Sequence, residues 1–268
     1  MNRSSRVPFI RACLPLAALF LSSWAVIGLS SSQAGRFALG DAWSKPSSAH
    51  LLGCADAGLD VARFVIFAVG YVLALAVAVS ILSAFVGTVL GATATYWGGI
   101  SERLLLKSCD LIQAFPNFLL ALAVLAAVER PKRWHIGAVF MLTAWAGFAR
   151  LTAILSRKLV AADFVVASKA LGASRFHVLC RHILPNILGP VAIQVGTVAA
   201  GVVLSESALS FVGLGPSDGI SLGVLIEQGA AGMLRAPHVL LAAAIALALA
   251  SGACQMAAEG LRHWVHRL

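Results

Sequence analysis

The sequence is poor in charge, and above all in negative charge. Of its 268 residues only 12% are charged, and 11 Asp and Glu stand against 20 Lys and Arg. A soluble domain carries about 25% charged residues, whereas this chain is 60% hydrophobic with a mean hydropathy of +0.90. The composition excludes an ordinary soluble domain and indicates an integral membrane protein. The net charge of +9 is then typical of basic residues that flank membrane spans, so we expect no nucleic-acid partner.

The sequence also lacks the common motifs of metal and nucleotide chemistry. It has no C-x-x-C pair among its five cysteines, which excludes the usual disulfide frameworks and thiolate metal sites. It has no Gly-Lys pair, and therefore no P-loop to cradle the phosphates of ATP, and it has no H-E-x-x-H zinc motif. We expect the two close histidine pairs, at 177/182 and 263/266, to be solvated residues beside the membrane rather than metal ligands. We therefore expect no catalytic residue, metal or cofactor in this chain.

Long apolar runs are what the sequence does have. A bilayer core of about 30 Å needs roughly 20 apolar residues per helix. Runs free of Asp, Glu, Lys and Arg predict an all-α membrane protein with six transmembrane helices, within 12–35, 64–101, 111–128, 134–149, 187–205 and 236–258. The second run is too long for one simple span, so we expect it to hold one span and an interfacial approach segment.

Basic residues orient these spans. With both termini in the cytoplasm, thirteen Lys and Arg fall on the cytoplasmic side and seven outside, as the positive-inside rule favours. The chain then divides into a tail with the first span (1–30), an extracytoplasmic loop (31–63), and a core of five spans (64–268) interrupted by a basic loop (157–186). A cleaved secretory signal is the alternative for the first run, but its apolar core is longer than usual and we expect it to be retained.

Small and ionisable residues mark positions within the spans. Ser83, Gly87, Gly91 and Thr95 recur every fourth position and predict a face for close helix packing. Pro116 predicts a kink in the third span, and we expect Asp110 to serve as an interfacial cap.

A second acidic residue, Glu206, lies near the outer end of the fifth span, beside Ser207 and Ser210. Burying a carboxylate in a membrane is costly. Two interpretations stay open: a translocation or gating residue, or a helix-end carboxylate bonded to local hydroxyl and amide groups.

The segment VASKALGASRFHVLCRHILPN (166–186) is basic and has no carboxylate. We predict a short helix over 161–171 with Phe164, Ala167 and Leu171 on one face, ended by Gly172 with positive φ. Ser174 is expected to cap a second short helix, and Pro185 to permit the start of the fifth span. The pair could lie on anionic lipid or dock into a groove on another protein.

Several motifs in order resemble one family. Ala167-x-x-Ala170-x-Gly172 followed by Ile183-x-Pro185 resembles the EAA loop of permease subunits of bacterial ABC importers. Similar stretches are LLGCADAGLDVARF (51–64), ATYWGGISERLL with DLIQAFP (94–116), ESALSFVGLG (206–215) and EGLRH (259–263). From about residue 50 to the end, the sequence is most similar to the C-type permease of dipeptide and oligopeptide systems.

The resemblance implies a multi-pass subunit of the bacterial cytoplasmic (inner) membrane. Its implied partners are a second homologous permease, two cytoplasmic ATPases that bind ATP and Mg, and an extracytoplasmic substrate-binding protein. Phe164, Ala167, Ala170, Leu171, Gly172 and Pro185 would form the ATPase-coupling element, and Asp60 and Arg63 would face the binding protein. Val166 stands where the family has Glu, which removes a polar contact there. Nickel, glutathione or antimicrobial-peptide import by the same fold are alternatives, and an ion-coupled secondary transporter is the alternative from another class.

Overall fold

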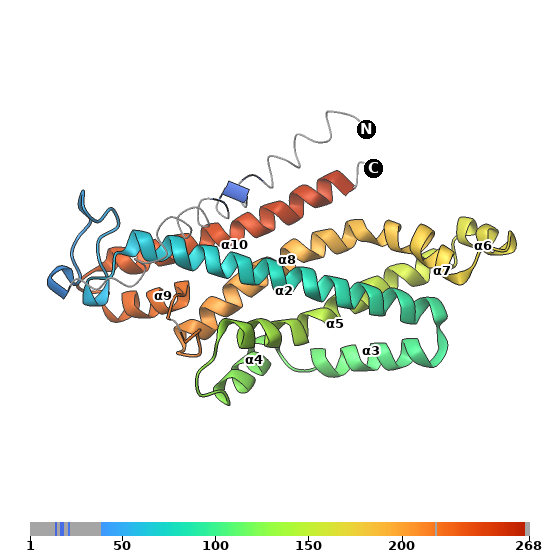
Figure 1. Cartoon of the computed structure of the whole chain (residues 1–268), viewed down its shortest axis with the longest axis horizontal. Coiled ribbons are helices and arrows are strands. Elements are labelled where there is room, and N and C mark those ends of the chain that lie inside the picture. The colour runs from blue at the N-terminus through green and yellow to red at the C-terminus, as the bar shows by residue number, and fades with distance from the viewer. Residues whose placement is uncertain (1–13, 15–16, 19–20, 22–38, 218, 266–268) are drawn as a thin grey trace.

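The computed structural model describes residues 39–217 and 219–265, together with Leu14, Ala17, Ala18 and Leu21. Over these residues the chain is helical, with one isolated β-bridge between Cys54 and Asp60. Most helices run along the long axis of an elongated molecule (Figure 1). The α-helices are α2 (Val61–Trp97), α3 (Gly99–Gln113), α4 (Asn117–Ala126), α5 (Arg133–Val160), α6 (Asp163–Ala170), α7 (Arg175–Val178), α8 (Leu184–Phe211), α9 (Leu222–Ala231) and α10 (Pro237–Val265). Two 3-10 turns, η1 (Leu39–Asp41) and η2 (Asp56–Gly58), precede them, and a π-helical segment, η3 (Leu179–Ile183), joins α7 to α8.

Four helical stretches are long and apolar enough to cross a membrane: Val61–Trp97, Arg133–Val160, Arg175–Phe211 and Pro237–Arg262. The pair α3 and α4 passes the same test together but is bent by 72°, which gives up to five spans. The predicted first span, 12–35, lies outside the described residues apart from four isolated positions.

The second apolar run forms one unbroken helix, in which no break separates the predicted span from an approach segment. α2 begins at the N-cap Asp60 and continues for 37 residues to Trp97, where Gly98 with φ of 68° turns the chain back into α3. At 1.5 Å per residue α2 is about 55 Å long, more than the thickness of a bilayer with its headgroups. Intrahelical hydrogen bonding and burial on neighbouring helices favour one straight element over a break.

The small-residue face of α2 packs against α5, as predicted. A Cβ added to Gly87 would lie 2.5 Å from the backbone oxygen of Trp145 and 2.6 Å from Cβ of Phe148. The hydroxyl of Thr152 donates to the backbone oxygen of Gly87 at 3.3 Å. Only glycine allows the two backbones to approach this closely.

The predicted kink at Pro116 is confirmed as a complete break. Pro116 is the N-cap of α4, and its missing N–H and fixed φ prevent α3 from continuing. α3 is a helix of its own that begins at Gly99, well before the predicted start of the third span at residue 111, and it lies beside α5 (Figure 1). Because α3 carries charged residues, the pattern of apolar runs did not predict it.

The described residues form four apolar clusters: a large one, a smaller one at the other end of the molecule, and two small ones around Phe148 and Cys109. The large cluster joins residues of α2, α4, α5, α8, α9 and α10, among them Leu73, Leu125, Ile136, Leu209 and Leu225, each fully buried. The smaller cluster joins Ala92 of α2 to Val165, Val178, Leu179, Ile183 and Ile187. It holds the basic loop against the ends of α2, α5 and α8.

Candidate functional site

The basic loop folds largely as the sequence predicts. α6 covers Asp163–Ala170, and Gly172 follows it with φ of 85°. A Cβ on Gly172 would meet no atom within 4 Å, so backbone strain alone would penalise a side chain here. Ser174 caps α7, and its hydroxyl accepts from the backbone N–H of His177 at 3.2 Å.

The two short helices are separate from each other, but the second one does not end before the fifth span, so the predicted new start of a helix at Pro185 is wrong. α7 continues through the π-helical segment η3 into α8, where Leu184 N–H donates to the oxygen of Leu179. Pro185 has no N–H and lies in the first turn of α8, where the wider π turn accommodates it. The amide of Asn186 donates to the backbone oxygen of His182 at 2.6 Å. The result is a helical stretch of 37 residues, Arg175–Phe211, that joins the loop rigidly to a span.

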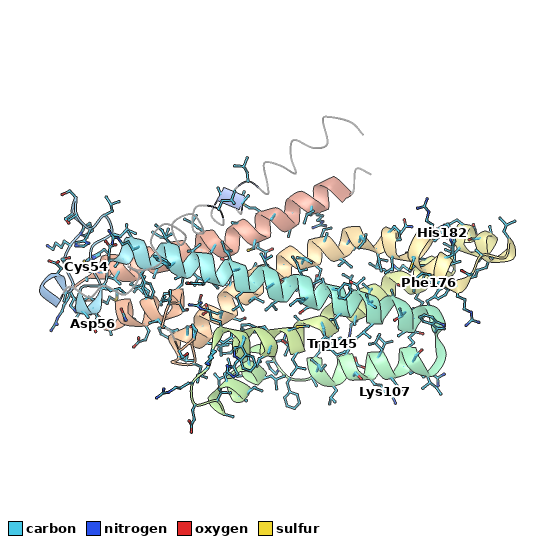
Figure 2. The ribbon with its side chains drawn as sticks, in the orientation of Figure 1. Cys54, Asp56, Lys107, Trp145, Phe176 and His182 are labelled. Carbon is cyan, nitrogen blue, oxygen red and sulfur yellow. The ribbon has the colours of Figure 1, made fainter. Side chains whose placement is uncertain are left out.

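The loop presents apolar side chains to solvent. The predicted docking residues Phe164, Ala167, Ala170, Leu171 and Pro185 are all exposed, and Leu171 is 89% exposed. Sequence reasoning missed Phe176, which is 73% exposed and, like His182, lies at this end of the molecule (Figure 2). Phe176 lies in the first turn of the helix that Ser174 caps, and this place in a short basic helix could have indicated that it is exposed.

Internal contacts fix the loop beneath this exposed face. Val165 is fully buried in the smaller apolar cluster. The hydroxyl of Ser168 lies 3.3 Å from Nε2 of His182, and the ring centroids of Phe164 and His182 are 6.0 Å apart. Nζ of Lys169 lies 5.1 Å from the ring centroid of Tyr96 at the end of α2. These contacts hold the exposed apolar side chains in a defined arrangement.

Two ion pairs connect α3 to α5 close to the loop. Arg157 contacts Oε1 of Glu102 through Nη2 at 2.6 Å and Nε at 3.1 Å. Arg150 pairs with Asp110, and Asp110 lies inside α3 rather than at a helix end, so its predicted role as a cap is wrong.

Glu206 lies buried at the junction of α8 and α9, with 3% of its surface exposed. Its carboxylate accepts from the hydroxyl of Ser210 at 2.9 Å and from that of Ser221, the N-cap of α9, at 3.2 Å. Ser207 is also buried here. The structure therefore contains the hydrogen bonds to nearby hydroxyls that one of the two sequence interpretations expected. One of these hydroxyls, that of Ser221, belongs to a different helix, α9. Gly219–Gly223 has the G-x-S-x-G spacing of hydrolase nucleophiles, but Ser221 follows no strand and its hydroxyl is bonded to Glu206.

Asp60 and Arg63 lie where the chain enters α2. One oxygen of Asp60 accepts from the backbone N–H of Arg63 at 3.1 Å and caps α2, and the other lies 2.9 Å from Nδ1 of His50. Asp60 is half-buried and Arg63 is exposed. The sequence did not predict that Asp60 is a helix cap, although its place before a long apolar run is typical of one.

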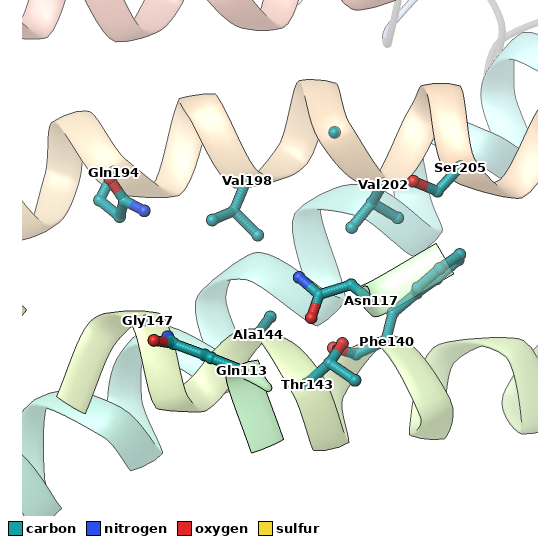
Figure 3. A pocket seen from close by; sticks show the side chains of 11 residues that line it. Gln113, Asn117, Phe140, Thr143, Ala144, Gly147, Gln194, Val198, Val202 and Ser205 are labelled. Atoms are coloured by element: carbon teal, nitrogen blue, oxygen red, sulfur yellow. The ribbon is translucent and has the colours of Figure 1, made fainter. Parts of the chain in front are cut away.

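Polar side chains from four helices surround a groove between α5 and α8 (Figure 3). The groove has a volume of about 330 Å³. Gln113 ends α3, Asn117 begins α4, Thr143 lies on α5, and Gln194 and Ser205 lie on α8. Apolar residues Phe140, Val198 and Val202 complete its walls. Sequence reasoning missed this groove, because its residues come from separate segments.

Comparison with known proteins identifies chains of similar sequence. Residues 84–267 match the family described as binding-protein-dependent transport system inner membrane component. A Brucella abortus protein, named provisionally as a peptide transport system permease protein, is 29% identical over 97% of this chain and 86% of its own length. The glutathione transport system permease protein GsiD of Escherichia coli is 33% identical, over 81% of this chain and 72% of its own length. The oligopeptide transport system permease protein OppC of Haemophilus influenzae is 31% identical, over 80% of this chain and 68% of its own length.

Proposed function

Because the chain belongs to the family of binding-protein-dependent transport system inner membrane components, we propose that it forms half of a translocation pathway for di- or oligopeptides. It is a transport subunit without an enzymatic site, and ATP is bound by partner ATPases. A binding protein delivers the peptide from outside, and a second homologous permease supplies the other half of the pathway. The relatives named for peptide, oligopeptide and glutathione transport support a peptide substrate, since glutathione is itself a small peptide.

The observation that carries this proposal is the exposed apolar face of the basic loop. Phe164, Leu171 and Phe176 are exposed on a segment that a buried core holds in place. Such a face is suited to a groove on a partner, because docking removes apolar surface from water at little cost in ordering. The continuous helix Arg175–Phe211 then joins the docked loop to the junction at Glu206. Closure of the ATPases around the loop would thereby bias the equilibrium between inward-facing and outward-facing permease.

We assign the chain six spans with both termini in the cytoplasm. The four long spans and the bent pair α3–α4 supply five, and the apolar run 12–35 would supply the sixth. The charge tally supports this orientation, which places the basic loop inside. Reporter fusions at Lys132 and at Arg175 should report opposite sides of the membrane, and the same side for both would contradict the topology.

The outer end has two roles in this proposal. Glu206 forms a latch that ties α8 to α9 through Ser221 at the outer mouth, with Ser207 and Ser210 buried beside it on α8. The burial of the Glu206 carboxylate supports a latch over a direct contact with substrate. Asp60 and Arg63 shape the entry to α2 on the side that faces the binding protein, with Arg63 as the exposed contact.

Reconstitution tests the proposal. Proteoliposomes containing this chain, the second permease and the ATPases should accumulate a radiolabelled peptide only when ATP and the binding protein are both supplied. The chain purified alone should hydrolyse no ATP. Peptide uptake driven by an ion gradient without ATP would instead identify a secondary transporter.

A further inference from the structure

We propose that the groove between α5 and α8 is a substrate-contact site for the peptide backbone, and that it is indifferent to the charge of peptide side chains. The inference rests on the proposed function and adds to it the chemistry that the pathway recognises. It places the contact on three amide side chains, those of Gln113, Asn117 and Gln194.

The groove is polar but carries no charge. Its polar groups are amides and hydroxyls, and no Asp, Glu, Lys, Arg or His is among the residues that line it. Figure 3 shows the amides of Gln113, Asn117 and Gln194 on two opposing walls, with Gln194 on α8 facing the other two. Within the described part of the chain, none of these three side chains has a hydrogen-bond partner, in contrast to Thr143, whose hydroxyl donates to the oxygen of Phe140 at 3.0 Å. Their donors and acceptors are open to a ligand.

The groove lies at the depth of the spans rather than at their ends. Its lining residues on α5 and α8 fall within 140–147 and 194–205, in the interior of helices Arg133–Val160 and Leu184–Phe211. The break at Pro116 lies beside it, and α4 begins there without a capping side chain. A broken helix with open N–H groups is tolerated at membrane depth only where it is buried in protein or lines a polar cavity. The polar groove is such a cavity.

The chemistry of the lining matches a peptide group. Side-chain amides donate and accept hydrogen bonds, as backbone amides do, so each can pair with a passing peptide bond in either direction. A neutral lining traps neither cationic nor anionic residues, and several weak contacts allow release as well as entry. The volume of about 330 Å³ is of the size of small-ligand sites. A Cβ on Gly201 would meet no atom within 4 Å, so α8 leaves room there for a ligand or for the second permease.

Helices that form the walls of the groove also lead to the loop that would dock on the ATPase. Gln113 is the last residue of α3, and α3 is held to α5 by the pairs Arg150–Asp110 and Arg157–Glu102. α5 continues to Val160, three residues before the start of α6. Movement of the loop would therefore change the distance between the α3 side and the α8 side of the groove, which loosens or tightens its hold on the peptide.

Introducing charge into the groove tests the inference in the full complex. Proteoliposomes would be supplied with the binding protein, ATP and three labelled peptides, Ala-Lys-Ala, Ala-Glu-Ala and Ala-Gln-Ala. Relative to the wild type, Gln194→Glu should raise the ratio of Ala-Lys-Ala to Ala-Glu-Ala uptake about tenfold or more, and Gln194→Lys should lower it by a similar factor. Gln255→Glu is the matched control, because Gln255 is exposed on α10 outside the groove, and it should leave the ratio unchanged. Gln113→Glu, at an exposed position, repeats the test if the Gln194 variants fail to assemble.

The opposite shifts of the two Gln194 variants are the decisive feature, since a purely structural defect would lower the uptake of all three peptides alike. If wild-type complexes transport the peptides but the ratio is unchanged in Gln194→Glu, Gln194→Lys and Gln113→Glu, the groove is not the contact site, and peptide import still stands. If wild-type complexes transport none of the three peptides, both the inference and the proposed function fail.

Discussion

The two ends of the molecule differ in how the side chains of the proposed sites are satisfied. At the end where α8 meets α9, which we propose faces outside, two carboxylates have partners within the chain: Glu206 bonds to Ser210 and Ser221, and Asp60 bonds to the start of α2 and to His50. At the loop end, Leu171 and Phe176 are exposed apolar groups on a segment that a buried core anchors, whereas the exposed Leu234 at the other end lies on a connection between helices. Substitutions at the outer end should therefore reduce stability, whereas substitutions on the loop surface should reduce association with a partner.

The largest effect is expected from Gly172→Val. With φ of 85°, a β-branched residue costs on the order of 1–2 kcal/mol in the backbone and should tilt α6 away from its docking position. We expect loss of transport and of ATPase co-purification at normal membrane abundance. Gly172→Ala should be milder, and Gly172→Asn milder still, because Asn tolerates the left-handed region.

Gly213→Val is the matched control for this comparison. Gly213 follows α8 at the outer end, has the same φ of 85°, and likewise has no atom within 4 Å of an added Cβ. It should retain ATPase recovery. If Gly172→Val recovers as much ATPase as Gly213→Val, the loop is not the coupling element.

Removing the docking face without straining the backbone should have the next largest effect. The double change Phe164→Ser and Leu171→Ser removes two exposed apolar side chains while Val165 keeps the loop anchored. ATPase recovery by affinity purification should fall several-fold, because less apolar area is buried on docking. The lipid-surface alternative predicts full recovery, since Lys169, Arg175 and Arg181 would still hold the loop on anionic headgroups.

Glu206 should affect stability more than association. Glu206→Ala leaves the hydroxyls of Ser210 and Ser221 without their acceptor, and each buried polar group so orphaned costs about 1–3 kcal/mol. The unfolding temperature of the detergent-solubilised chain should fall, with ATPase recovery unchanged. Glu206→Gln keeps an acceptor and should be milder. If Glu206→Gln transports normally but shifts preference between cationic and anionic peptides, Glu206 is a substrate contact and not a latch.

The smallest effect is expected at Asp60. Asp60→Ala removes the cap of α2 and should lower stability by about 1 kcal/mol, whereas Asp60→Asn retains a capping oxygen and should cost only a few tenths. Thermal unfolding in detergent measures both. A loss of binding-protein-dependent uptake in Asp60→Asn as large as that in Asp60→Ala would indicate a direct contact of the carboxylate with the binding protein.

Local rules predicted local features well. The positive φ at Gly172, the cap at Ser174, the break at Pro116 and the glycine face of α2 each depend on neighbours within one turn or on one residue type. Features joined across the sequence could not be predicted. α3 carries charges that its pairing with Arg150 and Arg157 compensates, and those partners lie 40 and 55 residues away. The groove needs four helices placed together, and the continuity of α7 with α8 depends on packing that favours a π turn over a break.

Photo-cross-linking from the two ends tests the central claim most directly. A benzophenone amino acid would replace Leu171, 89% exposed on the loop, or Leu234, fully exposed between α9 and α10 at the outer end. After irradiation of intact cells, the adduct at Leu171 should contain the ATPase subunit, and the adduct at Leu234 should not. Adducts at Leu171 that contain only lipid, or an ATPase adduct at Leu234, would contradict the account.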